Sequence, residues 1–166
     1  MRKAKTLVIL IWMLSLVGCG LLPSKDQEKE VHPKAVSLNK TYPEIRFKLH
    51  FFDSYVPPRR STGGIWLYTK EKHAGDIDQE FNWDQTDVLH IQISDSKYNG
   101  YSATPLNIQL MDEKTVRVIV KLEKGTDPFQ KETDAPRMYI EVEKGKLNED
   151  MKFIVEKDTG ETLRTK

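Results

Sequence analysis

Residues 106–122 read LNIQLMDEKTVRVIVKL, and this stretch decides the fold class. On either side of the polar residues 112–114, apolar and polar side chains alternate with a period of two. This alternation is typical of a β-strand whose two faces meet different surroundings. The stretch therefore predicts a β-hairpin, with strands at 106–110 and 116–122.

The same period-two pattern recurs along most of the chain. Further strands are expected at residues 45–51, 65–68, 88–93, 138–142 and 151–155. Turn residues separate these runs, and only one stretch, Gly75 to Phe81, favours a helical turn. The pattern predicts an all-β fold: a single small antiparallel β-sandwich, or a partly open barrel, of about seven strands.

The N-terminal segment has the pattern of an export signal. Three basic residues at positions 2, 3 and 5 precede a short apolar run at 7–17 and then small residues. The run is too short to cross a bilayer core, which needs about 20 apolar residues. We therefore expect residues 1–18 to be a cleaved signal peptide.

The end of this segment, Leu16-Val17-Gly18-Cys19, resembles the lipobox of bacterial lipoproteins. The resemblance implies cleavage between Gly18 and Cys19 and attachment of acyl chains, such as palmitate, through the Cys19 sulfur. The alternative is an ordinary signal peptide with an incidental cysteine. Because Cys19 is the only cysteine, the chain forms no internal disulfide. Two or three acyl chains anchor a protein stably, so the expected location is the outer side of the cytoplasmic membrane.

Composition divides the remainder into a tether and a domain. Residues 24–34 are polar and alternate in charge, which predicts a flexible tether within a lipidated N-terminal segment, 19–44. Residues 45–166 form the expected extracytoplasmic β-rich domain. Removal of residues 1–18 takes three of 26 basic residues and none of 25 acidic ones, leaving a net charge of about −2. This balance gives no basis for a nucleic-acid partner.

One region is similar to a known family. The segments 81–84 (FNWD), 88–91 (VLHI), 99–102 (NGYS) and 134–140 (DAPRMYI) follow the order of elements in the C-terminal domain of the protease-complex subunit PrcB. The resemblance covers roughly residues 81–146 and departs from the family at Asn99, where a glycine is usual, and at Asn82-Trp83. It implies a non-catalytic, lipid-anchored domain that binds or stabilises an extracytoplasmic protease complex.

The histidines and the acidic residues are the candidates for metal binding or acid–base chemistry. The four histidines (His32, His50, His73 and His90) lack an HxH or HxxxH arrangement and are expected at the surface. A group of acidic residues (Asp76, Asp78, Glu80, Asp84 and Asp87) has spacing that calcium sites use, but it lacks the EF-hand order. Hydrated loop carboxylates are the preferred interpretation.

The sequence also lacks a phosphate loop and gives no serine the setting of a nucleophile. Gly63-Gly64 lacks the rest of a phosphate loop and predicts a turn into the strand at 65–68. The preceding Arg59 and Arg60 are candidates for contact with an acidic partner. No GxSxG or SxxK motif presents a serine as a nucleophile, so we expect neither an enzyme nor a metal or cofactor site.

Four aromatic residues are candidates for a binding surface: Trp66, Tyr68, Tyr98 and Tyr101. An exposed platform of such rings suits contact with a protein or a glycan, whereas the preferred interpretation places them in the core. The leading hypothesis is a non-catalytic module that binds or assembles with an envelope or extracellular protein. A lipoprotein that binds cell-wall glycan or another ligand is the alternative, and a hydrolase with an unrecognised site is the third.

Overall fold

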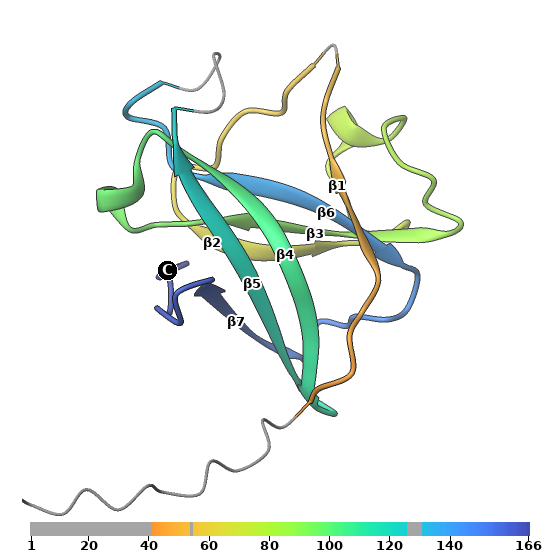
Figure 1. The fold of residues 1–166 in the computed structure, drawn as a ribbon. Coiled ribbons are helices and arrows are strands. Elements are labelled where there is room, and N and C mark those ends of the chain that lie inside the picture. The colour runs from red at the N-terminus through yellow and green to blue at the C-terminus, as the bar shows by residue number, and fades with distance from the viewer. Residues whose placement is uncertain (1–40, 54, 126–130) are drawn as a thin grey trace, which may run out of the picture. The chain divides into compact units, whose positions relative to one another are not determined.

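The computed structural model describes residues 41–53, 55–125 and 131–166 (Figure 1), all within the compact unit Lys40–Lys166. The predicted signal peptide, the lipobox with Cys19, nearly all of the tether, and His32 lie outside the described residues. In the part that is described, no helix has the length and apolar character needed to cross a bilayer.

The described chain contains seven strands and two short 3₁₀ turns. The strands are β1 (Phe47–His50), β2 (Gly64–Tyr68), β3 (Thr86–Gln92), β4 (Tyr101–Asp112), β5 (Thr115–Lys124), β6 (Arg137–Glu143) and β7 (Lys152–Lys157). The turns are η1 (Gly75–Ile77) and η2 (Ser96–Tyr98). All seven predicted strands are confirmed, and η1 falls where one helical turn was expected. The hairpin that alternates most regularly in sequence forms β4 and β5.

The strands form two sheets that pack face to face, which confirms the all-β class and is consistent with a small sandwich (Figure 1). One sheet has the order β1-β6-β3-β2 and the other β4-β5-β7. All neighbours are antiparallel except β5 and β7, which run parallel. This pair departs from the antiparallel expectation because the chain leaves β5, crosses to the other sheet as β6, and returns as β7 in the original direction.

The main core lies between the two sheets. Alternate residues of each strand supply it, including Leu89 and Ile91 from β3, Ile140 from β6, and Val116 and Val118 from β5, each with no exposed surface. Burying an aliphatic side chain of this size contributes about 1.5–3 kcal/mol, so the period-two pattern is the main determinant of the fold. The other face of the β4-β5-β7 sheet carries the charged positions of its strands.

A second apolar cluster covers the outer face of the four-stranded sheet. It contains Tyr68, Ile77, Phe81, Trp83, Val88 and Tyr139, with Phe52 and Trp66 packed against it. The connections between β1 and β2 and between β2 and β3 supply Phe52, Ile77, Phe81 and Trp83. As a result β3 is buried on both faces, and the polar residues His90 and Gln92 on its outer face are only 1–2% exposed. The expectation that this face of β3 is solvated is therefore wrong.

Candidate functional site

The outer face of the four-stranded sheet carries a cluster of stacked rings. His90 of β3 stacks on Tyr139 of β6, with ring centroids 4.1 Å apart and planes 6° apart. On its other side in the sheet, Trp66 of β2 lies 5.0 Å from the His90 ring. These contacts follow from the strand register, which pairs His90 with both Trp66 and Tyr139. The cluster is a structural centre of this face, and Trp66 is the ring of the three that also lines the groove described below.

A chain of hydrogen bonds links His90 to Arg60, and burial keeps the His90 ring neutral. Arg60 Nη2 donates to Tyr68 Oη at 2.7 Å, and Tyr68 Oη lies 3.2 Å from His90 Nδ1. The Tyr68 hydroxyl can donate to an unprotonated Nδ1 or accept from a protonated one, so this contact fits either tautomer of His90. His90 Nε2 is buried and has no hydrogen-bond partner among the described residues. Burial, helped by the positive charges of Arg137 and Arg60, lowers the pKa of His90 to about 3, so the ring is neutral at pH 7.

The segment that carries Arg59 and Arg60 is held against the sheet by side chains. Gln92 Nε2 donates to the carbonyl oxygens of Arg60 (2.8 Å) and Thr62 (3.0 Å), and the Arg60 N–H donates to Gln92 Oε1 (3.1 Å). Arg59 donates to the Ala135 carbonyl and pairs with Asp134 at 3.2 Å. Both arginines are thus engaged within the domain, and Arg60 also lies 4.7 Å over the Trp66 ring.

Glycine is required at positions 63 and 64 because other side chains lie very close to the backbone there, and not because the pair binds an anion. A Cβ atom on Gly63 would lie 2.5 Å from the Ser94 Cβ, and one on Gly64 would lie 2.4 Å from the indole of Trp66. A residue with a Cβ atom therefore does not fit at either position unless its neighbours move. The predicted turn into a strand is confirmed, since β2 begins at Gly64.

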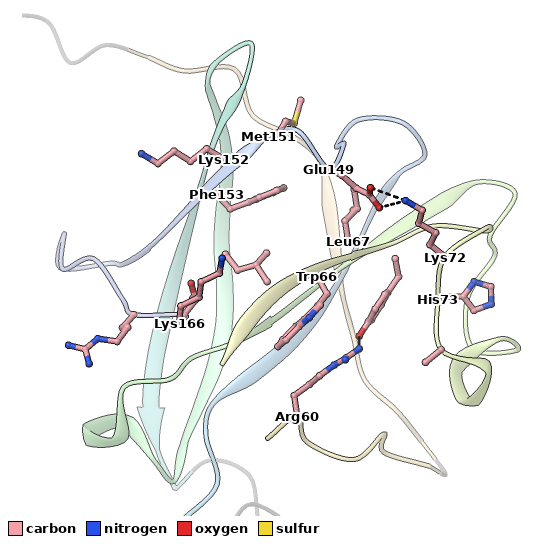
Figure 2. Close-up of a pocket in the computed structure, with 15 residues that line it drawn as sticks. Arg60, Trp66, Leu67, Lys72, His73, Glu149, Met151, Lys152, Phe153 and Lys166 are labelled. Carbon is pink, nitrogen blue, oxygen red and sulfur yellow. Dashed lines mark hydrogen bonds and ion pairs between the residues drawn. The ribbon is translucent and has the colours of Figure 1, made fainter. Parts of the chain in front are cut away.

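A groove of about 1110 Å³ runs between the two strands β2 and β7 (Figure 2). In Figure 2, Trp66 and Leu67 lie on one wall, and Lys152 and Phe153 lie on the strand opposite. We call this feature the β2–β7 groove. Its apolar lining consists of Ile65, Trp66, Leu67, Met151 and Phe153, and its basic lining of Arg60, Lys72, Lys152, Arg164 and Lys166.

The charge of the groove contrasts with that of the chain. Among the residues that the structure describes, five basic side chains line it, and Glu149 is the one carboxylate side chain. Both Glu149 oxygens accept from Lys72 Nζ at 2.9 Å (dashed in Figure 2), so this carboxylate is already paired. The whole chain, by comparison, has a formal charge of +1. The groove therefore concentrates positive charge around an apolar floor.

A smaller cavity of about 300 Å³ lies beneath the segment that follows β1. Pro57, Pro58, Arg60, Tyr68 and Tyr139 are among the residues that line it. Burial raises the pKa of Tyr139 to about 12, so its hydroxyl is protonated at neutral pH. This cavity borders Tyr139 of the ring cluster. Its lining carries both signs of charge, because Asp76 lies there together with Arg59 and Arg60.

The four aromatic candidates occupy two separate places. Trp66 is half-buried and lines the groove together with Tyr68, which is 8% exposed. Tyr98 is also 8% exposed and donates to Glu161 Oε2 at 2.6 Å, with the Tyr101 ring 5.6 Å away. Neither Tyr98 nor Tyr101 lines the groove. The role of these residues in binding stays a prediction, and in the structure Tyr68 and Tyr98 are core residues.

The described histidines are less exposed than expected. His90 is 1% exposed, so its assignment to the surface is wrong. The side chains of His50 and His73 are 12% exposed. His73 Nε2 lies 2.8 Å from Asp78 Oδ1, which raises the pKa of His73, and its ring stacks on Trp83 at 4.1 Å. His50 Nδ1 lies 3.2 Å from Glu141.

The acidic residues of the loop before β3 go to separate partners. Asp76 accepts from Tyr55, Asp78 bonds to His73, Glu80 lies 3.7 Å from His50, and Asp84 pairs with Lys70 at 2.7 Å. Asp87 is buried and accepts from the Gly145 N–H at 2.7 Å, so for this residue the expectation of a hydrated carboxylate is wrong. Among the residues that the structure describes, no three His, Cys, Asp or Glu side chains are placed to hold a metal ion.

Comparison with known proteins gives no relative: no family model, curated protein or solved structure matches this chain. Fold and site together define a small β-sandwich with a basic, apolar-floored groove along two strands. Sequence reasoning singled out Trp66 and Arg60 but not Phe153, Lys152 or Arg164. These residues are distant in sequence from β2, so only the packing of the two sheets brings them to one site.

Proposed function

We propose that this chain is a lipid-anchored extracytoplasmic module that binds another protein at the membrane surface and performs no catalysis. The observation that carries the proposal is the β2–β7 groove. Protein-binding sites combine an apolar centre with a polar rim and favour aromatic and arginine side chains. The groove has this composition, with Trp66 and Phe153 in its lining and Arg60 and Lys152 beside them.

The anchor supports the same function. The lipobox resemblance at residues 16–19 implies attachment through Cys19, which would confine the domain to the membrane surface. Confinement raises the local concentration of the domain near other envelope proteins, so that a weak contact suffices for assembly. The resemblance of residues 81–146 to the PrcB domain makes an extracytoplasmic protease complex one candidate partner.

Glycan binding, the alternative, receives less support from the geometry. A sugar stacks on an open aromatic face, but the Arg60 guanidinium lies over the Trp66 ring at 4.7 Å. Tyr68 is 8% exposed, and its hydroxyl is already bonded to Arg60. The two rings therefore offer a sugar little free surface, whereas the strand edges and basic side chains of the groove suit a polypeptide.

The anchor is tested by a Cys19→Ser variant expressed in a bacterial host that processes lipoproteins. We expect the wild-type chain to incorporate labelled palmitate and to sediment with membranes. The variant should remain an unprocessed precursor without label. Normal processing of the Cys19→Ser variant, or incorporation of labelled palmitate by this variant, which has no thiol, would contradict the lipid anchor.

The groove is tested by photo-crosslinking in intact cells, with a photoreactive amino acid at Lys152. The matched control carries it at Thr104, an exposed residue of β4 at the opposite edge of the same sheet. We expect one crosslinked protein species at Lys152 that is missing at Thr104 and is lost when Phe153 is replaced by alanine. Equal patterns at the two positions would refute the groove as the binding site.

A further inference from the structure

β2 is an edge strand with an open side. It ends the order β1-β6-β3-β2, and within the described part of the chain it pairs only with β3. In an antiparallel pair, the backbone N–H and C=O groups of successive residues point alternately toward and away from the neighbour. Alternate residues of β2 therefore direct their backbone groups into the β2–β7 groove.

The register identifies these residues. The Ile93 N–H donates to the Pro136 oxygen at 2.9 Å, so the backbone of Ile93 points toward β6. By alternation, Ile91 and Leu89 also point toward β6, and Val88, His90 and Gln92 point toward β2. Their partners Tyr68, Trp66 and Gly64 complete the ladder between β2 and β3. The remaining residues of the strand, Ile65 and Leu67, present their N–H and C=O groups to the groove.

The same alternation applies to β7 on the opposite wall. The Lys152 N–H donates to Lys114 O on the β5 side, while Val155 O accepts from the Leu163 N–H on the other side. Val155 and Phe153 therefore point away from β5. The C-terminal segment covers this edge at Val155, but Phe153 lies beyond that cover and lines the groove. Both walls thus combine apolar side chains with outward-facing backbone.

A partner for such a site must supply backbone groups and negative charge. Unpaired strand edges are templates for added strands, in which backbone bonds give affinity and flanking side chains give selectivity. Five basic side chains and one paired carboxylate line the groove, so an acidic segment is complementary. β2 has five residues, which corresponds to an extended ligand of about 17 Å.

We infer that the β2–β7 groove binds an extended acidic segment of a partner protein, which adds to β2 as a fifth strand of the β1-β6-β3-β2 sheet. Its backbone pairs with Ile65 and Leu67, and its carboxylates lie against Lys166 and the other basic side chains that line the groove. This inference rests on the proposed protein-binding function and specifies how that site recognises its partner.

Hydrogen exchange measured by NMR on the detergent-solubilised full chain tests strand addition directly. The probe is a capped seven-residue peptide of alternating glutamate and valine. In the free protein, the amides of Ile65 and Leu67 should exchange faster than those of Trp66 and Tyr68. At about 90% occupancy by the peptide, exchange at Ile65 and Leu67 should slow about tenfold, because only the free tenth of the molecules exchanges.

Charge selectivity is tested with matched variants and peptides. Lys166→Glu, at an exposed residue that lines the groove, should raise the Kd for the acidic peptide about fivefold, the effect of roughly 1 kcal/mol. Lys124→Glu, an exposed change at the far end of β5 that does not line the groove, should leave the Kd unchanged. A peptide with lysine in place of glutamate should not bind.

The outcomes separate this inference from the proposed function. Peptide binding that leaves exchange at Ile65 and Leu67 unchanged overturns strand addition. Equal binding of the acidic and lysine peptides overturns the acidic preference. Crosslinking at Lys152 together with either result keeps the groove as a protein-binding site. If no protein is crosslinked at Lys152 but the acidic peptide slows amide exchange at Ile65 and Leu67 selectively, the proposed protein-binding function is overturned. The inference that the groove binds an acidic strand is then supported.

Discussion

Acidification should destabilise this domain through His90, and a His90→Gln variant isolates the effect. The folded-state pKa of His90 is about 3, compared with 6.5 for an unperturbed histidine. Below pH 6.5 the histidine binds a proton in the unfolded chain but stays unprotonated in the folded chain. The free energy of unfolding is therefore retained above this pH and falls as the pH decreases toward 3. At pH 5 the linkage relation gives a loss of about 2 kcal/mol relative to pH 7.

The assay is urea denaturation followed by tryptophan fluorescence at pH 7, 6 and 5. His90→Gln keeps a polar group beside the Tyr68 hydroxyl but does not titrate, so the variant should lose about 2 kcal/mol less than the wild type between pH 7 and 5. His73 acts in the opposite direction in both proteins, because its pKa is raised, and it cancels in the difference. Parallel pH profiles would refute the reasoning. So would an NMR titration in which the His90 ring of the wild type protonates near pH 6.5, a measurement that needs no variant.

Three further substitutions, two of them with a matched control substitution, test the packing by denaturation. Gly64→Ala should displace the tryptophan ring that lies over it and cost about 1–3 kcal/mol, whereas Gly75→Ala, with no atom within 4 Å of its added Cβ, should be nearly neutral. Leu89→Ala should cost about 2–5 kcal/mol, and the matched Leu106→Ala, at a residue 48% exposed, less than about 0.5 kcal/mol. Asp87→Ala should cost about 1–3 kcal/mol, because it removes the acceptor of a backbone N–H in the loop after β6. Equal effects within either matched pair, or a neutral Asp87→Ala, would show that the described packing is incorrect.

The strands could be predicted because apolar and polar residues alternate along neighbouring positions of the sequence. The residues of β4 and β5 alternate so regularly that their pairing follows from neighbouring sequence, and the turn at 113–114 brings them together. The same holds for the positions of the other strands, because each buries one face against a core. The basic–apolar start of the chain likewise predicts export from local sequence alone, and that prediction concerns residues outside those described.

The site was only partly predictable. Trp66 and Arg60 are conspicuous in sequence, but the second wall of the groove comes from residues 151–166, which reach β2 only through sheet packing. His90 was placed at the surface because its neighbours in sequence alternate. Nothing local indicates that the loops before β2 and β3 fold back over it.

The amino-acid sequence by itself determined the strands, their buried faces and the all-β class, since a period of two is a property of neighbouring residues. Only the tertiary structure decided the parallel pairing of β5 with β7, the second core over β3, and the open edge of β2 beside β7. These features depend on which distant segments meet. Which segments meet depends on the total apolar surface that both sheets and their loops bury together, and no single stretch of the sequence determines it.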